Sequence, residues 1–423
     1  MQTAATAIQG VATPITVLPA RRHGGASITH SRDFNEVTVK LLSGAIALVS
    51  PTCAYAQQDA MFSFSGFGTL GVVHSTEDQA DFTPDIQTEE GAGASHSTSA
   101  RPDSRIAGQV NANFTEKFTG VLQVTSEYAE RGDYDPKVTL AHVKYQFGPQ
   151  FAARLGRITA PLYMLSEYQR VGYATPWVRP PYEVYNYLLP MDGVEGVYTI
   201  NAGESVVSVQ GFYGRINSKK ADVYAMRGLA LGLKSGASTF RAAYIVGTTD
   251  FDTPQLDRLF SAYQRINPAL ADRLTTYGVD GSFASVGYAY DPGSWFLRSE
   301  VIRADYSPSL NGKTTSGYLS VGGRFGTLTP SLTYANVDRK GPTIAPGQDP
   351  VGVMTRALAQ AESGRHSFTA ALRWDARESL AFKLQASHIN NNAGSFGSLN
   401  NIQPGFRPGG SYNLLSASVD FVF

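Results

Sequence analysis

The histidines are the residues of this chain best suited to acid–base chemistry, but the sequence around them contains no recognisable catalytic motif. Nucleophilic catalysis needs a serine, cysteine or threonine beside a positioned base. After residue 56 no histidine stands in a nucleophile motif, and no Cys/His cluster has zinc spacing. We therefore expect no enzyme, no metal and no cofactor, with a hydrolase as the less favoured alternative. The histidines are His74, His96, His142, His366 and His388.

A larger set of ionisable residues stands at alternate positions of long segments. In RIAGQVNANF, from Arg105 to Phe114, Ile, Gly, Val, Ala and Phe alternate with Arg, Ala, Gln and Asn. Successive side chains of a strand point to opposite faces, so one face is apolar and the other is wet. On the wet faces the basic residues are Arg105, Lys144, Arg154, Arg241, Arg298, Arg324, Arg373 and Lys383, and the acidic ones are Glu127, Glu195, Glu300 and Asp420.

The alternating segments are too long for an ordinary soluble sheet. Strands average about 5–6 residues in globular proteins, whereas a tilted strand crosses a bilayer in about 9–11. Many segments here run to ten residues or more, so the lengths favour a membrane barrel over a secreted β-sandwich. Strands are predicted near 61–73, 103–116, 118–129, 137–147, 151–157, 192–201, 205–214, 222–234, 238–247, 279–291, 294–306, 314–325, 327–338, 365–375, 379–390 and 411–423.

The connections alternate between short turns and long loops. Short turns such as Gly148-Pro149-Gln150 and Asp291-Pro292-Gly293 alternate along the chain with long loops such as 74–102 and 248–278. Sixteen antiparallel strands require this pattern, with turns on the periplasmic side and loops outside. In lipid every backbone N–H and C=O needs a partner, so the sheet must close. The sequence thus predicts an all-β transmembrane antiparallel barrel of about 16 strands.

The first 56 residues read as a secretory signal peptide. The apolar stretch LLSGAIALVS follows Lys40, and Ala54-Tyr55-Ala56 has the form of a cleavage site. The leader is long, and Val37 or Val39 are alternative starts. Cleavage also removes Cys53, the one cysteine, and leaves 31 basic against 33 acidic residues. So balanced a charge excludes the strongly basic surface that nucleic-acid binding needs.

Three stretches give the chain a family resemblance. The opening strand FSFSGFGTLGVV, the long third loop and the terminal SASVDFVF together resemble a Gram-negative outer-membrane porin. That resemblance implies a sixteen-stranded barrel, commonly a homotrimer, placed in outer-membrane lipid by the barrel assembly machinery. It also implies passive diffusion of small hydrophilic solutes through the barrel. A substrate-specific or plugged barrel that serves as a receptor or adhesin is the alternative.

The third loop, residues 158–190, is implied by the resemblance to fold into the lumen and narrow it. It is rich in Tyr and Pro, which departs from the acidic loop of the general porins, so the selectivity of that family does not carry over to this chain. With Arg154, Arg179 and Glu183 near the constriction and an excess of basic wall residues, we expect a mild preference for anions or carboxylates. The alternative is that these charges pair with one another. The aromatic residues of the loop could line a path along which sugars or aromatic acids slide, but we prefer the alternative that they pack the loop against the wall. They are Tyr173, Trp177, Tyr182, Tyr185 and Tyr187.

Two of the outer loops are predicted to contain helices. Thr253-Pro254 supplies a capping residue and a first-turn proline, and Asp349-Pro350 repeats the pattern. We expect these helices to cover the barrel mouth, with partner binding or gating as the alternative.

The chain ends on an aromatic residue that a closing strand explains. Phe421 and Phe423 alternate with polar residues in a last strand that must pair with the first. By resemblance, the terminal aromatic is also the signal read by the assembly machinery. We predict that deletion of Phe423, or a charged tail after it, impairs assembly far more than the same change in an outer loop. Surface levels of heat-modifiable protein measure this, and unchanged levels would refute it.

Overall fold

The structure is a computed structural model that describes residues 61–83, 88, 90–128, 132–185, 190–218, 221–251 and 253–423. The predicted signal peptide, residues 1–56, and Tyr187 lie outside this part of the chain. Within it, no helix has the length and apolar character needed to cross a membrane.

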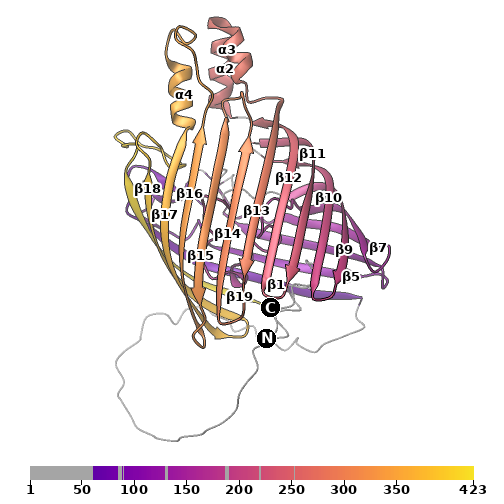
Figure 1. Ribbon diagram of the computed structural model, residues 1–423. Helices are drawn as coiled ribbons and strands as arrows, with labels where there is room; N and C mark the ends of the chain where they lie inside the picture. The colour runs from indigo at the N-terminus through magenta and orange to yellow at the C-terminus, as the bar shows by residue number, and fades with distance from the viewer. Residues whose placement is uncertain are drawn as a thin grey trace, which may run out of the picture.

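Sixteen long strands form one closed antiparallel barrel (Figure 1). Each strand pairs with its neighbours along the chain, and the last returns to pair with the first over nine residue pairs. The predicted fold class and all sixteen strands are confirmed. The strands are β1 (Phe62–Ser75), β5 (Arg105–Asn113), β6 (Phe118–Glu127), β7 (Lys137–Gln146), β8 (Phe151–Thr159), β9 (Pro190–Ala202), β10 (Ser205–Asn217), β11 (Ala221–Ser235), β12 (Ser238–Phe251), β13 (Val279–Tyr290), β14 (Trp295–Asp305), β15 (Lys313–Gly323), β16 (Leu328–Lys340), β17 (Ser363–Arg377), β18 (Leu380–Asn391) and β19 (Ser411–Val422).

The barrel wall is apolar outside and polar inside along most strands. On β18, Phe382 and Leu384 are 38% and 60% exposed, whereas Lys383 and Gln385, which alternate with them, are buried. This is the inverse of a soluble protein and suits a wall that faces lipid. Outward aromatic side chains are Phe147, Phe325, Trp374 and Phe423 near the short turns, and Tyr213, Tyr244, Tyr334 and Phe368 further toward the long loops.

The seam between β1 and β19 brings glycines against the terminal aromatic rings. Gly66 and Phe423 exchange backbone hydrogen bonds of 2.8 and 3.0 Å, so the last residue takes part in closing the sheet. A Cβ added to Gly66 would lie 2.3 Å from the Phe423 ring, and one added to Gly68 would lie 2.3 Å from the Phe421 ring. The two glycines therefore leave the space in which both rings lie over the first strand.

Three short helices stand at the mouth of the barrel, on the side of the long loops (Figure 1). They are α2 (Pro254–Ile266), α3 (Pro268–Leu274) and α4 (Val353–Ala361). Thr253 caps α2 by accepting a hydrogen bond from the Leu256 amide, as predicted, but the run divides at Asn267, which caps α3. The helices share a small apolar core that includes Tyr263 and Met354.

The prediction that the helix in the later loop, α4, starts at Asp349-Pro350 was wrong. The helix α4 begins at Val353, after Gly352 in a left-handed conformation with φ of 67°. Asp349 still reaches the first turn, because its carboxylate accepts from the Thr355 amide at 2.7 Å and from the Tyr263 hydroxyl. A tertiary contact with α2 thus shifts the boundary that the local pattern suggested.

The glycine seam can be tested with a matched pair of substitutions. Gly66 and Gly108 are opposite each other on β1 and β5, but an added Cβ at Gly66 also meets the Ala107 carbonyl at 2.7 Å, whereas Gly108 has nothing within 4 Å. Gly66→Val should displace the Phe423 ring and lower the melting temperature of the folded barrel. Gly108→Val should leave it close to wild type, since valine favours strands. Equal melting temperatures for the two variants would contradict this account of the seam.

Candidate functional site

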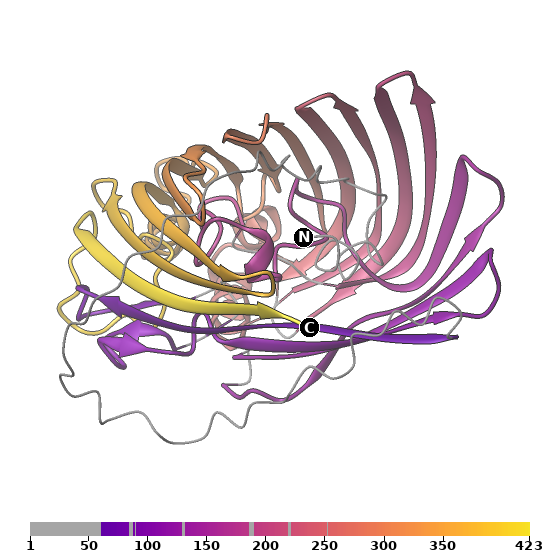
Figure 2. The ribbon, with the colours of Figure 1, turned by 90° about the horizontal axis from the view of Figure 1, so that it is seen from below.

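The third loop, which connects β8 to β9 in the chain, crosses the interior of the barrel (Figure 2). Its first part places Tyr163 and Leu165, 3% and 1% exposed, against the inner face of β10 to β14, in a core with Phe212, Met226 and Ile245. Burying side chains of this size contributes about 1.5–3 kcal/mol each. The loop is therefore packed onto the wall along one side of the lumen.

The aromatic residues of the loop belong to this packing. Trp177 is 1% exposed and donates from Nε1 to Thr333 Oγ1 at 3.0 Å. Tyr185 is also buried, donates to the Glu300 carboxylate and packs against Tyr318. With these rings covered, the placement favours the packing alternative over an aromatic slide for solutes.

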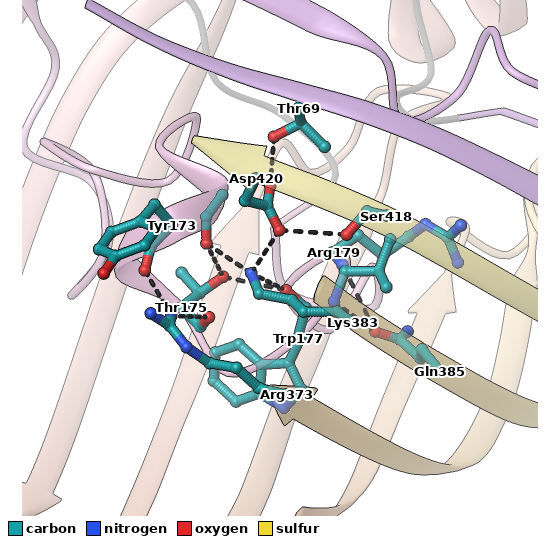
Figure 3. A network of polar contacts seen from close by, with 12 residues as sticks. Thr69, Tyr173, Thr175, Trp177, Arg179, Arg373, Lys383, Gln385, Ser418 and Asp420 are labelled. Carbon is teal, nitrogen blue, oxygen red and sulfur yellow. Dashed lines mark hydrogen bonds and ion pairs between the residues drawn. The ribbon is translucent and has the colours of Figure 1, made fainter. Parts of the chain in front are cut away.

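Lys383 holds the middle of the loop in place (Figure 3). Its ammonium donates to the carbonyls of Gly172 at 2.6 Å and Trp177 at 2.8 Å, and pairs with Asp420 at 3.0 Å. Both charged side chains are fully buried, and the three partners match the three N–H donors of a lysine. Asp420 also accepts from the Thr69 hydroxyl, so β1, β18 and β19 meet at this point. We call Lys383 and Asp420 the loop clamp.

The neighbouring strand supplies a second anchor to the same turn of the loop. Arg373 on β17 donates to the carbonyl of Tyr173 and, at 3.0 Å, to that of Thr175. Gln385 on β18 accepts from the Val178 amide at 2.9 Å. Arg373 and Lys383, both assigned to the pore lining from sequence, therefore bind loop backbone.

Arg179 and Glu183 pair with residues that the sequence did not single out. Arg179 donates to both carboxylate oxygens of Asp103, at 2.9 and 2.5 Å, and to Ser416. Glu183 pairs with Arg365 at 3.1 Å, and both side chains are at most 4% exposed. Asp103 precedes β5 and Arg365 lies near the outer end of β17, where alternation gives no reliable face. In the sequence, the charges of Arg179 and Glu183 on the loop were the one sign that the loop must find charged partners on the wall.

A further group of charges joins the loop to the opposite side of the wall. Arg154 on β8 donates to the Glu195 carboxylate and to Glu167 of the loop at 3.0 Å. Arg170 of the loop donates to Glu127 on β6 at 2.9 Å. The acidic wall residues are thus occupied by protein partners, which supports part of the expectation that the charges pair with one another.

Several basic groups keep donors that no described residue accepts. These are Arg105 Nε, Arg241 Nε and Arg298 Nη1. Lys144 is exposed and makes no ion pair within the described chain. One loop carboxylate oxygen, Glu167 Oε2, is likewise without a partner there. The unpaired polar atoms of the described chain therefore include donors of three wall arginines, and all three atoms are buried.

Arg324 lies apart from this group, in the periplasmic turn after β15. It donates to both carboxylate oxygens of Asp291 at 2.7 Å. Partial burial acts to raise the pKa of Asp291, but the hydrogen bonds and charge of Arg324 outweigh it and hold that pKa below its usual value.

The fold and this interior define a class: a closed barrel with an apolar outer band and a polar lumen narrowed by its third loop. The wall is built to lie in lipid, and the fold of the barrel is that of the porins.

Comparison with solved structures gives the relatives of the fold. The chain is similar to the anion-selective porin from Comamonas acidovorans, with a TM-score of 0.54, 14% identity, and coverage of 86% of this chain and 99% of that one. It is also similar to Salmonella typhi OmpF in complex with daunomycin, with a TM-score of 0.52, 11% identity, and coverage of 86% and 97%. No family model and no curated protein matches the sequence. The likeness lies in the fold.

The loop clamp can be tested against an exposed pair of the same composition. Lys383→Met leaves Asp420 buried without its cation, which should destabilise the barrel by about 3 kcal/mol or more and free the middle of the loop. Lys340→Met removes an exposed partner of Asp338 and should cost less than about 1 kcal/mol. Urea unfolding measures both values.

A second variant separates loop release from loss of stability. Lys383→Met combined with Asp420→Asn removes the buried charges together, so it should recover stability while the carbonyls of Gly172 and Trp177 still lack the ammonium that ties them to the wall. Single-channel records should then show larger or noisier currents than wild type. Wild-type records from this double variant would contradict the anchoring role.

Proposed function

We propose that this protein is a water-filled outer-membrane channel for passive diffusion of small hydrophilic solutes, and that it is not an enzyme. The observation that carries the proposal is the contrast between an apolar outer wall and an inner wall that carries charged side chains. Among the described residues no group of histidine, cysteine and carboxylate side chains could hold a metal. His142 is buried on the wall of β7, and its Nδ1 has no hydrogen-bond partner within the described chain.

The surplus of cationic side chains on the inner wall supports a mild preference for anions or carboxylates. Glu127 forms an ion pair with Arg170, and Glu195 forms one with Arg154, so the charges of both carboxylates are compensated locally. Arg105 and Lys144 stand on the strands β5 and β7, which the apolar first part of the loop does not cover. A lumen whose uncompensated charges are cationic concentrates anions.

A plugged receptor or adhesin is the second candidate function. It is favoured by the extent to which the loop fills the barrel and by the helices above the mouth (Figure 1). Ion current separates the two: a channel conducts in steps, and a plugged barrel of the same fold conducts little.

We further propose that the protein forms a homotrimer in outer-membrane lipid, after insertion by the barrel assembly machinery. A shallow hollow of about 990 Å³ lies against β14 to β19 and is lined mainly by small and branched apolar residues, including Leu332, Ala370, Leu384 and Leu415. An apolar hollow on this side offers a surface for a neighbouring copy.

Charge selectivity is tested by reversal potentials in a KCl gradient across planar bilayers. Wild type should give a chloride-to-potassium permeability ratio above 1. Combined Arg105→Gln and Lys144→Gln should lower that ratio about twofold, because two open cationic groups are lost from the lumen. Arg324→Gln is the matched control, since its charge is already paired with Asp291, and should leave the ratio unchanged.

Two results would overturn parts of the proposal. A cation preference in wild type would refute anion selectivity while leaving the channel intact. An absence of stepwise current from folded, heat-modifiable protein would instead favour the plugged receptor.

A further inference from the structure

Three arginines that point outward from the barrel wall lie together near the extracellular side. They are Arg157 on β8, Arg215 on β10 and Arg227 on β11, and each stands two residues from an outward apolar or aromatic residue on the same face of its strand. Asp192 on β9 is in register with Arg157 on one side and Arg215 on the other. We call these four residues the outer arginine patch. Another outward arginine, Arg303, lies on β14, three strands from β11.

The patch carries more positive charge than its own carboxylate can compensate. Arg157 takes both oxygens of Asp192, at 2.7 and 2.8 Å. Arg227 donates to the Ala225 carbonyl at 3.1 Å. The Arg215 guanidinium interacts with the charge of Asp192 but makes no side-chain hydrogen bond within the described chain. Two guanidiniums therefore remain available for an anion.

A bulge in β11 turns one of these arginines outward. The register shifts between Tyr224 and Arg227, and Ala225 has φ of 47°, a left-handed conformation that a residue with a Cβ rarely adopts. Regular alternation from the outward Tyr224 would place Met226 outside and Arg227 inside. The bulge instead buries Met226 in the loop-packing core, at 3% exposed, and exposes Arg227. Bulges re-aim side chains in this way.

The wall below the patch is apolar. Moving from the patch toward the periplasmic side, the next outward residues are Leu155 below Arg157, Val194 below Asp192, Tyr213 below Arg215 and Leu229 below Arg227, at 62%, 44%, 55% and 59% exposed. A charged patch above an apolar surface matches the shape of a lipid, whose charged headgroup lies above its acyl chains. An arginine on the lipid face is unfavourable unless it reaches water or a charged headgroup.

We propose that the outer arginine patch binds the phosphate of a phosphorylated lipid in the outer leaflet, with the acyl chains on Leu155, Val194, Tyr213 and Leu229. Guanidinium groups bind phosphate oxygens in pairs and suit this contact. Asp222 and Asp250 lie closer to the extracellular end of the wall, and within the described chain they make no ion pair with the patch. This inference goes beyond the channel function and does not depend on conduction.

The test is lipid titration of the purified, detergent-solubilised protein by native mass spectrometry, with diphosphoryl lipid A as the probe. Arg215→Gln and Arg227→Gln should each weaken binding about fivefold at low salt. Arg303→Gln is the control for loss of an outward arginine elsewhere and should leave binding unchanged. Heat-modifiable mobility on gels shows that each variant is folded.

Two comparison ligands identify what is recognised. Dephosphorylated lipid A should bind at least tenfold more weakly than the diphosphoryl form, and added inorganic phosphate should compete only at much higher concentration. Equal weakening in Arg303→Gln, no binding by wild type, or indifference to the lipid phosphates would overturn the proposal. Competition by inorganic phosphate at the concentration of the lipid would overturn the lipid assignment in favour of a free-anion site.

Discussion

The pairing of the last strand with the first is the constraint on which the rest of the structure depends. A strand in lipid cannot leave its edge unpaired, because no water is present to bond its amides and carbonyls. Closure here needs glycines where the terminal rings lie, at Gly66 and Gly68. It also brings Thr69 of β1 onto Asp420 of β19. Asp420 in turn neutralises Lys383, so the seam and the third loop are stabilised by the same buried carboxylate.

The loop needs such anchors because it has little regular structure of its own. The middle of the loop forms a short 3-10 turn, η1 (Gly172–Ala174), in which the Gly172 carbonyl accepts from the Thr175 amide at 3.0 Å. The carbonyls of Tyr173, Thr175 and Trp177 instead accept from side chains. Buried carbonyls require donors, and the wall supplies them from Lys383 and Arg373. Several residues that alternation assigns to the pore wall thus serve to satisfy loop backbone, which is a use that their spacing cannot reveal.

The sequence predicts the barrel well because the barrel depends on local features. Alternation with a period of two, strand length and turn residues are all readable within ten or so neighbours, and all sixteen strands follow from them. Contacts between distant segments do not follow. The partners of Arg179 and Glu183 are Asp103 and Arg365, and nothing local to either pair indicates the other member. The start of α4 failed for a related reason, since Asp349 is drawn to Tyr263 on another helix.

The inner wall is itself divided into two kinds of surface, and this division limits where water can run. From β10 to β14 the inward residues include Phe212, Met226 and Ile245, which the first part of the loop covers. From β5 to β8 they include Gln109, Gln123 and Lys144. A loop packed on the apolar half and clamped at the seam leaves the polar half as the surface that needs solvation. The loop also reaches this half through the ion pairs Arg170–Glu127 and Arg154–Glu167. In the channel that we propose, solutes therefore pass along β5 to β8 around these two ion pairs, and the remaining charges on those strands decide which ions enter.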